Sequence, residues 1–311
     1  MSEQSNQQPR IARLDPVVAN RIAAGEVVER PGSVVKELVE NSLDAGARRI
    51  DIRLLDGGRR RIQVTDDGVG MGPEDAALAF ERHATSKIRS AHDLIRVGTY
   101  GFRGEALASI ASVGRVAMFT RRAGDELGVH VAAEAGEPLL LKPAACAVGT
   151  DLVIEELFSS VPARLAFLRT PATELGHVIR FVDAIALADP QLHLTLCNND
   201  RSICDYRPAS DLKGRAAAVF GSEVAARLYP IVGDGDYAVA GALSEPGLNR
   251  RGPGALVLLV GGRPVRDRTL QHAVAQAYGT LMDSGRYPVG VLGIACPAGT
   301  VDVNVHPAKS E

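Results

Sequence analysis

Residues 33–45 constrain the fold more than any other segment, because they carry a clear helical period with two contrasting faces. Pro31 is a favourable first helical residue and Gly46 a natural stop, so a helix is expected between them. One side must cover a core, and the other leaves a polar stripe whose ordinary interpretation is a solvated surface. The apolar face comprises Val35, Leu38, Val39 and Ser42, and the polar face comprises Glu37, Asn41 and Asp44, with Glu40 at its edge.

The sequence around this helix mixes strand and helix patterns, which predicts an α/β fold. Apolar residues alternate with polar ones over 50–54 and again over 62–64, on either side of Gly57 and Gly58, as in a hairpin. The stretch 83–104 has weak periodicity and is interpreted as a functional loop, such as a lid. Further strands are expected at 116–120, 128–132, 150–155, 193–197, 237–242, 256–260 and 289–294, and further helices at 15–24, 73–82, 104–112, 175–188, 269–278 and ending at 220.

Length and composition indicate a globular chain of two domains. At about 150 residues per domain, 311 residues suggest two, and we place the boundary after Pro208, giving domains 1–208 and 209–311. The longest apolar runs are far too short to cross a membrane, so no membrane role is expected. The first ten residues are polar and are interpreted as a flexible arm, and four cysteines without metal-type spacing fit a reducing cytoplasm.

The charge balance does not by itself favour nucleic acid. The formal net charge is -2, so any contact with DNA needs a local basic surface. Arg263, Arg266 and Arg268 form one such cluster, although an ordinary solvated face can carry the same residues. These three arginines are the candidate DNA-binding residues.

A nucleotide site is possible only without the usual phosphate loop. No Gly-Lys pair occurs anywhere in the chain, which excludes a P-loop enzyme. Glu37 could act as a general base on a water that attacks a terminal phosphate. Asn41, one turn later on the same face, could offer its carboxamide oxygen to Mg²⁺. Both roles fit one face of one helix, but spacing alone does not favour Glu37 over Glu40.

Further candidates lie in turns and loops. Asp66 ends a predicted strand and could accept a hydrogen bond from an adenine amine, while Gly68 and Gly70 would let the backbone approach a flat ring. The segment 101–104 leads into a predicted helix, whose free N–H groups favour phosphate oxygens. Lys309 could reach a γ-phosphate. Taken alone, each feature is more often an ordinary turn, helix start or surface lysine.

Seven motifs together resemble those of MutL-type DNA mismatch-repair proteins, which belong to the GHKL ATPases. The match runs in the family's order over nearly the whole chain. GFRGEAL and HPAK distinguish MutL from the topoisomerase, chaperone and histidine-kinase members of that superfamily. The motifs are IAAGEVVERP (22–31), VKELVENSLDAGA (35–47), DDGVG (66–70), RHATSK (82–87), GFRGEALASI (101–110), VGT (148–150) and VDVNVHPAK (301–309).

The resemblance implies a GHKL (Bergerat-type) α/β sandwich followed by a smaller ribosomal-protein-like α/β domain. It implies ATP and Mg²⁺ as cofactors, ATP-dependent homodimerisation, and contacts with DNA and a MutS-type mismatch-recognition protein. It assigns Glu37 as general base, Asn41 as Mg²⁺ ligand and Lys309 as γ-phosphate contact. The remaining nucleotide-binding residues that it implies are Asp66, Gly68, Gly70, Thr85, Lys87, Gly101, Phe102, Arg103, Gly104, Glu105 and Thr150.

Two departures and two alternatives remain. Asp67 stands where the family often has Asn, which is expected to put a second carboxylate near the adenine site. Gly261 stands where the family often has Asn, which is expected to alter a strand end. The alternatives are a clamp that binds ATP and DNA without functional hydrolysis, and a topoisomerase-type or chaperone-type GHKL ATPase.

Overall fold

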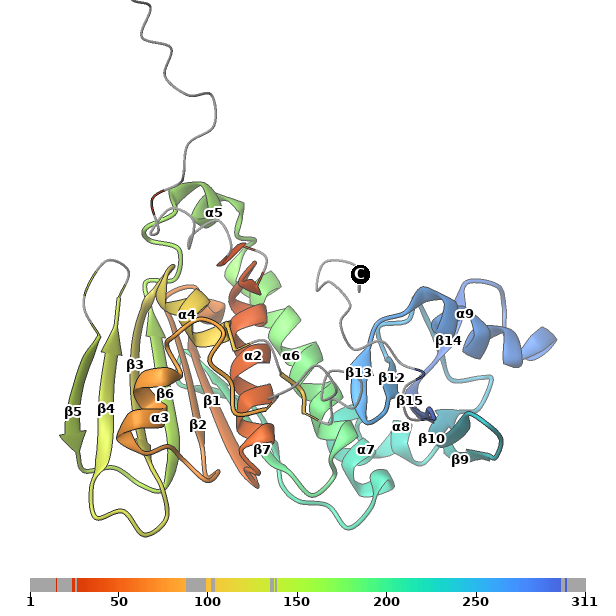
Figure 1. Cartoon of the computed structure of the whole chain (residues 1–311). Coiled ribbons are helices and arrows are strands. Elements are labelled where there is room, and N and C mark those ends of the chain that lie inside the picture. Colours follow the sequence, from red (N-terminus) through yellow and green to blue (C-terminus); the bar gives the residue numbers. More distant parts are fainter. Residues whose placement is uncertain are drawn as a thin grey trace, which may run out of the picture.

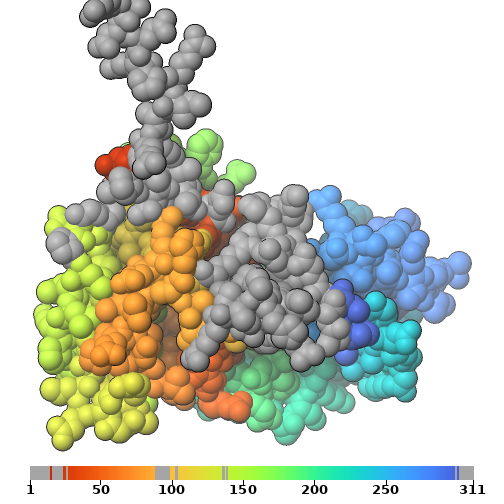
Figure 2. Space-filling model, viewed as in Figure 1, coloured from red at the N-terminus to blue at the C-terminus, as the bar shows by residue number. Residues whose placement is uncertain are grey.

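The computed structural model describes residues 15, 24, 25, 27–87, 99–101, 104–134, 137, 139–297 and 300. These residues form two α/β units, each built on its own sheet (Figure 1). Figure 2 shows the same view in space-filling form, with the orange to yellow-green surface of the first unit on the left and the blue surface of the second unit on the right. None of the helices within the described ranges is long and apolar enough to cross a membrane.

The first unit contains an eight-stranded sheet that is antiparallel except for one pair. The pair β1–β7 is parallel and joins segments almost 150 residues apart in the chain, such as Ile50 and Leu194. The expected hairpin is confirmed as β1 and β2, joined by the short 3₁₀ turn η1 (Asp56–Gly58). In spatial order the strands are β5 (Leu140–Ala144), β4 (Gly128–Ala133), β3 (Arg115–Arg121), β6 (Gly149–Glu155), β2 (Arg61–Asp66), β1 (Arg49–Leu55), β7 (His193–Asn198) and β8 (Arg201–Tyr206).

Helices cover one face of this sheet (Figure 1). The expected amphipathic helix is confirmed as α2, whose apolar face is buried against the sheet at Val35, Leu38 and Val39. The helix ends at Asp44, and two residues later Gly46 has a φ of 71°, which suits glycine. The helices of this unit are α2 (Pro31–Asp44), α3 (Pro73–Leu78), α4 (Ala106–Ala111), α5 (Pro162–Phe167) and α6 (Pro171–Ala188).

Helix boundaries differ from expectation where capping decides them. Helix α6 begins at Pro171 rather than at 175, because the Thr170 side chain accepts a hydrogen bond from the Thr173 N–H and Pro171 suits the first turn. Helix α3 ends at Leu78 rather than at 82. The expected helix at 15–24 falls almost entirely outside the described residues.

The second unit contains a five-stranded sheet and a short two-stranded ribbon. Gly261 and Gly262 connect β12 to β13 with φ of 56° and 80°, a turn that Asn-Gly also suits, so the departure at Gly261 preserves the strand end. The five strands are β13 (Arg263–Val265), β12 (Leu256–Val260), β15 (Gly290–Ala295), β10 (Ala238–Ser244) and β9 (Leu228–Gly233). The ribbon is β11 (Asn249–Arg251) with β14 (Arg286–Pro288), and the helices are α7 (Leu212–Phe220), α8 (Ser222–Ala225), α9 (Arg268–Ala277) and the 3₁₀ turn η3 (Gly279–Leu281).

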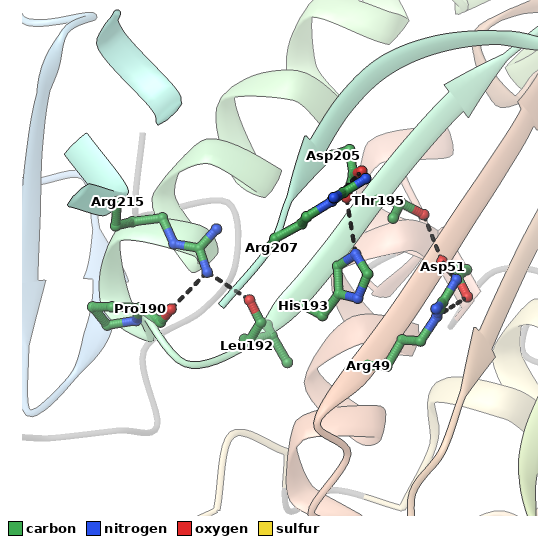
Figure 3. Close-up of polar contacts among 9 residues, drawn as sticks. All are labelled: Arg49, Asp51, Pro190, Leu192, His193, Thr195, Asp205, Arg207 and Arg215. Carbon is green, nitrogen blue, oxygen red and sulfur yellow. Dashed lines mark hydrogen bonds and ion pairs between the residues drawn. The ribbon is translucent and has the colours of Figure 1, made fainter. Parts of the chain in front are cut away.

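The two units share a buried cluster. Leu187 at the end of α6 packs with Ala216 of α7, Leu259 of β12 and Val291 of β15. Beside it, Arg215 is fully buried, and its guanidinium donates to the carbonyl oxygens of Pro190 and Leu192 at 2.7 and 2.6 Å (Figure 3). The second unit is therefore packed against α6 and the loop that follows it.

Candidate functional site

Two groups of polar residues contact the C-terminal half of helix α2, one through Ser42 and the other through Asn41 and Asp44. The first group surrounds Asp66, at the end of β2. The Ser42 hydroxyl and the Gly68 N–H donate to the Asp66 carboxylate at 2.7 and 2.9 Å, and the Thr150 N–H also donates to it. Burial raises the pKa of Asp66, and these three hydrogen bonds oppose that shift. The carboxylate is thus held in a fixed orientation beside the start of the 66–70 turn.

Thr150 lies directly opposite Asp66 in the sheet. Its hydroxyl is 3.1 Å from the hydroxyl of Thr120, which also accepts a hydrogen bond from the Met71 N–H at 2.9 Å. The hydroxyls of Thr120 and Thr150 therefore connect β3 and β6 to the end of the 66–70 turn. The structure brings Thr150 into the neighbourhood of Asp66, as the sequence predicts.

The glycines of the turn are close to protein backbone. A Cβ on Gly70 would lie 2.0 Å from the carbonyl oxygen of Arg121, and its φ is 65°, so only glycine fits there without displacement. A Cβ on Gly68 would lie 2.8 Å from the Cβ of Ala45. Both glycines therefore allow the turn to pack against β3 and the end of α2. The sequence alone predicts only that these glycines let the backbone approach a flat ring.

The expected second carboxylate near the adenine site has a different partner. The Oδ1 atom of Asp67 accepts hydrogen bonds from the N–H groups of Arg48 and Arg49, at 2.7 and 2.8 Å. Asp67 therefore ties the turn to the start of β1. Its negative charge still contributes to raising the pKa of Asp66, as a smaller effect than burial.

The second group surrounds Asn41 and Asp44 on the polar face of α2. The Lys87 ammonium lies 2.8 Å from Asn41 Oδ1 and 2.5 Å from Asp44 Oδ2, and these lysine and aspartate side chains are only 18% and 6% exposed. The N–H groups of Tyr100 and Gly101 donate to the same Asp44 carboxylate at 2.8 and 3.1 Å. Two predicted residues, Lys87 and Gly101, are thus brought to Asn41 through Asp44.

The other predicted residues of this region lie nearby. The Lys87 N–H donates to the Thr85 hydroxyl at 3.2 Å, and Glu105 at the start of α4 pairs with His83 at 3.1 Å. Gly104 has a φ of 61°, and a Cβ on it would lie 2.4 Å from the carbonyl oxygen of Ala84. Phe102, Arg103 and Lys309 lie outside the described residues.

Glu37 and Glu40 differ in their surroundings. Both project from α2, and Glu40 has a 14% exposed side chain 3.9 Å from Lys36. Burial raises the pKa of Glu40 to about 7, Lys36 opposes the shift, and Glu37 adds to it. Arg263 of the second unit also acts on Glu40 electrostatically. Glu40 therefore lies within electrostatic reach of the second unit, and Glu37 shares the stripe of Asn41 and Asp44 by helical spacing.

The raised pKa of Glu40 predicts a pH-dependent stability. The pKa in the folded chain, about 7, lies above the unfolded value, so the stabilisation is complete at acidic pH and is lost as pH rises through about 7. Glu40→Gln removes this loss and should raise the free energy of unfolding at pH 8 by about 3 kcal/mol, with little change near pH 4.5. Urea unfolding across this range measures the effect, and parallel profiles for parent and variant would contradict it.

The three candidate DNA-binding arginines have different environments. Arg266 and Arg268 are exposed, whereas Arg263 is partly buried. The Arg263 guanidinium donates to the Thr99 carbonyl oxygen and lies over the ring of Tyr100, 5.4 Å from its centroid. Arg263 is thus engaged within the chain, and the other two are open to solvent.

Sequence reasoning gave no role to Ser42, Asp44 or Tyr100, although all three hold the candidate site together. The spacing of Asp44 from Asn41 was the available signal, because residues three apart on a helix are neighbours. No local signal identified Tyr100, whose N–H reaches Asp44 across 56 positions of sequence.

Comparisons with known families agree with this architecture. Residues 29–139 match the family model of histidine kinase-, DNA gyrase B- and HSP90-like ATPases, and residues 216–311 match that of the DNA mismatch repair protein C-terminal domain. The fold resembles the Aquifex aeolicus MutL ATPase domain complexed with ADP, at 26% identity and a TM-score of 0.67 over 87% of this chain and 93% of that one. It also resembles the N-terminal domain of a DNA repair protein, at 23% identity and a TM-score of 0.78 over 94% of this chain and 91% of that one.

Relatives in sequence are closer. The MutL protein of Geotalea uraniireducens is 48% identical over 97% of this chain and 50% of its own length, and that of Limosilactobacillus reuteri is 44% identical over 97% of this chain and 45% of its own. The chain spans about half the length of the curated relatives it matches. The first unit is a GHKL ATPase domain and the second a smaller α/β unit. With such identity over nearly its whole length, the chain belongs to the MutL family of DNA mismatch repair proteins.

Proposed function

We propose that this chain binds ATP with Mg²⁺, hydrolyses it slowly, and uses the nucleotide state as a switch on DNA. The observation that carries the proposal is the pair of polar groups on α2. A fixed carboxylate, Asp66, is bonded to Ser42 on the buried side of α2, and the Asn41–Asp44–Lys87 cluster lies on its polar side. Two such groups suit a ligand with an amine-bearing ring at one end and phosphates at the other.

Each end has a distinct role in the proposal. Asp66 accepts a hydrogen bond from the adenine amine, with Gly68, Gly70 and Thr150 shaping the pocket around it. At the other end Lys87 and the segment 101–104, which includes Phe102 and Arg103, contact the phosphates, with Thr85 and Glu105 supporting that loop. Lys309 from the second unit contacts the γ-phosphate, which couples nucleotide state to the second unit.

Glu37 is the proposed general base. A carboxylate at this position of α2 takes a proton from the attacking water while the phosphates are held beyond Asn41. Glu40 is the closest competitor, because its pKa of about 7 is also suited to proton transfer. Its position beside Arg263 and Lys36 favours an electrostatic role instead.

The donors around Asn41 fit a hard cation. The Asn41 carboxamide oxygen already faces a positive group, the Lys87 ammonium, and the Asp44 carboxylate is adjacent. Oxygen donors of this kind are those that Mg²⁺ prefers, and the ion, when bound, neutralises charge on phosphate oxygens. Asn41 is the proposed protein ligand.

The test of this proposal combines nucleotide binding, hydrolysis and oligomeric state. We expect slow ATP hydrolysis that requires Mg²⁺, and dimers in the presence of a non-hydrolysable ATP analogue, measured by phosphate release and light scattering. Asn41→Ala should weaken binding of the analogue in Mg²⁺ by about tenfold or more and change its binding in EDTA far less. Equal losses with and without Mg²⁺ would show that Asn41 acts only on the fold or the nucleotide.

A DNA contact is proposed for the exposed arginines Arg266 and Arg268. Other basic groups lie near them on α6: burial lowers the pKa of both His177 and Arg180, and the positive charge of Arg266 lowers both further. Arg30 lies 3.1 Å from His177. The lowered pKa of His177 favours a neutral imidazole, so the positive charge in this region comes from Arg30, Arg180 and Arg266, despite the net charge of -2.

Charge reversal tests this contact. Arg266→Glu and Arg268→Glu should weaken DNA binding at low salt and reduce the slope of log affinity against log salt by about one unit for each DNA phosphate that is no longer neutralised. Fluorescence anisotropy with a labelled duplex at several salt concentrations gives both quantities. If the double variant binds as tightly as the parent at low salt, the DNA surface lies elsewhere.

The partners, location and domain limits of the chain are also proposals. We propose that it forms a homodimer on ATP binding, communicates with a MutS-type protein and acts in the cytoplasm. The proposed domain limits are 1–208 and 209–311. The rival in which ATP binding alone acts as a signal predicts nucleotide-induced dimers without hydrolysis. The topoisomerase-type and chaperone-type alternatives are disfavoured, because 48% identity to a MutL protein extends over 97% of the chain.

A further inference from the structure

We infer that Arg263 is a positioning residue that couples the second unit to the Mg²⁺-ligand face of α2, in addition to its place in a basic cluster. The inference rests on the proposed role of Asn41. The proposed contact of Lys309 with the γ-phosphate is one connection between the two units, and Arg263 provides a second one through residues 99–101. This connection is formed within the described residues.

The first step is the contact between the units. Arg263 begins β13, directly after the Gly261–Gly262 turn. Its guanidinium donates to the Thr99 carbonyl oxygen and covers the Tyr100 ring at 5.4 Å from the centroid. The Tyr100 hydroxyl reaches back to the Gly262 carbonyl oxygen at 3.5 Å. The β12–β13 turn and residues 99–100 are therefore joined by contacts in which each segment supplies a hydrogen-bond donor to the other.

The second step runs from this contact into the candidate site. The Tyr100 and Gly101 N–H groups donate to the two oxygens of the Asp44 carboxylate, at 2.8 and 3.1 Å. Asp44 in turn holds the Lys87 ammonium, which donates to Asn41 Oδ1. A continuous series of polar contacts thus joins Arg263 to the proposed Mg²⁺ ligand.

The physical chemistry of Arg263 suits this role better than that of its neighbours. A planar guanidinium can bond a carbonyl oxygen and stack on an aromatic ring at the same time, which an ammonium cannot do as well. The positive charge also acts on Glu40 and Tyr100, both of which lie on the first unit. In the described part of the chain, Arg266 and Arg268 are exposed and lack such an engagement with the ring of Tyr100.

The three arginines therefore have different roles. Movement of the β12–β13 turn displaces residues 99–101, which changes how Asp44 and Lys87 are held and so where Asn41 presents its oxygen. Arg263 therefore tunes Mg²⁺-dependent nucleotide binding. Arg266 and Arg268 tune affinity for DNA.

The experiment uses the whole chain with Arg263→Ala and the matched variant Arg266→Ala. Amide hydrogen exchange at Tyr100 and Gly101 is measured first, without nucleotide, because those two N–H groups bond to Asp44. We expect Arg263→Ala to speed their exchange by about tenfold or more, and Arg266→Ala to leave it at the parent rate. Equal exchange in Arg263→Ala and the parent would overturn the inference, whether or not the chain hydrolyses ATP.

The second measurement is the binding of a non-hydrolysable ATP analogue in Mg²⁺ and in EDTA. Arg263→Ala should weaken binding roughly 5- to 150-fold in Mg²⁺ and much less in EDTA, while Arg266→Ala should lower DNA affinity instead. A loss of the same size in both conditions would mean that Arg263 only stabilises the packing of the units. Failure of Mg²⁺ to affect the parent itself would count against the proposed function rather than against the coupling.

Conservative variants keep the inference testable if Arg263→Ala misfolds. Arg263→Lys retains the positive charge but not the planar guanidinium, so we expect an amide exchange rate at Tyr100 between those of the parent and Arg263→Ala. Tyr100→Phe keeps the ring under Arg263 and loses only the 3.5 Å hydroxyl contact with Gly262, so it should lie closer to the parent than to Arg263→Ala, whereas Tyr100→Leu should resemble Arg263→Ala. If Arg263→Ala and Tyr100→Leu have additive effects on Mg²⁺-dependent binding, the two side chains act independently and the inference is wrong.

Discussion

Glu37→Ala is expected to lower the rate of ATP hydrolysis by about 10²- to 10⁴-fold while leaving the affinity for a non-hydrolysable analogue within a few-fold of the parent. The reason is that a general base contributes mainly to the transition state, after the water and the phosphates are already positioned. The proposed binding contacts at Asp66, Asn41 and Lys87 remain in this variant. Single-turnover phosphate release and analogue binding, measured on the same preparation, give the two quantities.

Glu40→Gln is the matched control, because Glu40 projects from the same helix but faces Lys36 and Arg263. It should retain turnover. If Glu40→Gln loses hydrolysis and Glu37→Ala does not, the base is Glu40. Unchanged turnover in both variants would favour the rival in which ATP binding alone is the signal.

Arg215→Ala should produce the largest loss of stability among the substitutions considered, about 3 to 5 kcal/mol. Arg215 is 0% exposed, and its guanidinium donates to the carbonyl oxygens of Pro190 and Leu192. Its charge also lies 5.8 Å from the centroid of the Tyr206 ring, whose hydroxyl donates to Asp183 at 2.6 Å. Alanine leaves the buried Leu192 carbonyl oxygen and the partly buried Pro190 carbonyl oxygen without this donor, and it opens a cavity between α7 and the loop after α6.

Arg215→Met separates the polar from the packing contribution. Methionine fills much of the same volume without a charge. The Nε and Nη1 atoms of Arg215 have no hydrogen-bond partner among the described residues of the parent, so burying them already costs stability. We therefore expect Arg215→Met to lose about half as much stability as Arg215→Ala or less. Urea unfolding monitored by circular dichroism compares the variants, and equal stability of Arg215→Ala and the parent would contradict the assigned role.

The sequence predicted best those elements whose pattern is local. The period of α2 follows from Val35, Leu38 and Val39 alone, and the hairpin of β1 and β2 follows from alternation around Gly57 and Gly58. Strands β5 and β8 were missed because they form the two edges of the large sheet and are mostly exposed. An edge strand with little buried surface has no apolar alternation to detect.

The sequence placed several residues in one candidate site but gave no indication of the contacts that join them. Asn41, Lys87 and Gly101 were each identified, yet the residue that gathers them, Asp44, received no role. Its partners lie 43 to 57 positions along the chain, and periodicity carries no information over that distance. The engagement of Arg263 with Tyr100 spans a still longer separation, so a basic cluster was all that the sequence could indicate.

The parallel pairing of β1 with β7 has a consequence for how the chain acquires its structure on the ribosome. Strand β1 emerges early, but the strand that lies beside it begins only at His193. Its antiparallel partner β2 is available at once, whereas its other edge stays open until strands β3 to β6 and helix α6 have been synthesised. Long-range pairing of this kind slows folding and leaves an edge exposed to wrong partners. Nascent chains that end before β7 should therefore depend on chaperones more than those that extend past it.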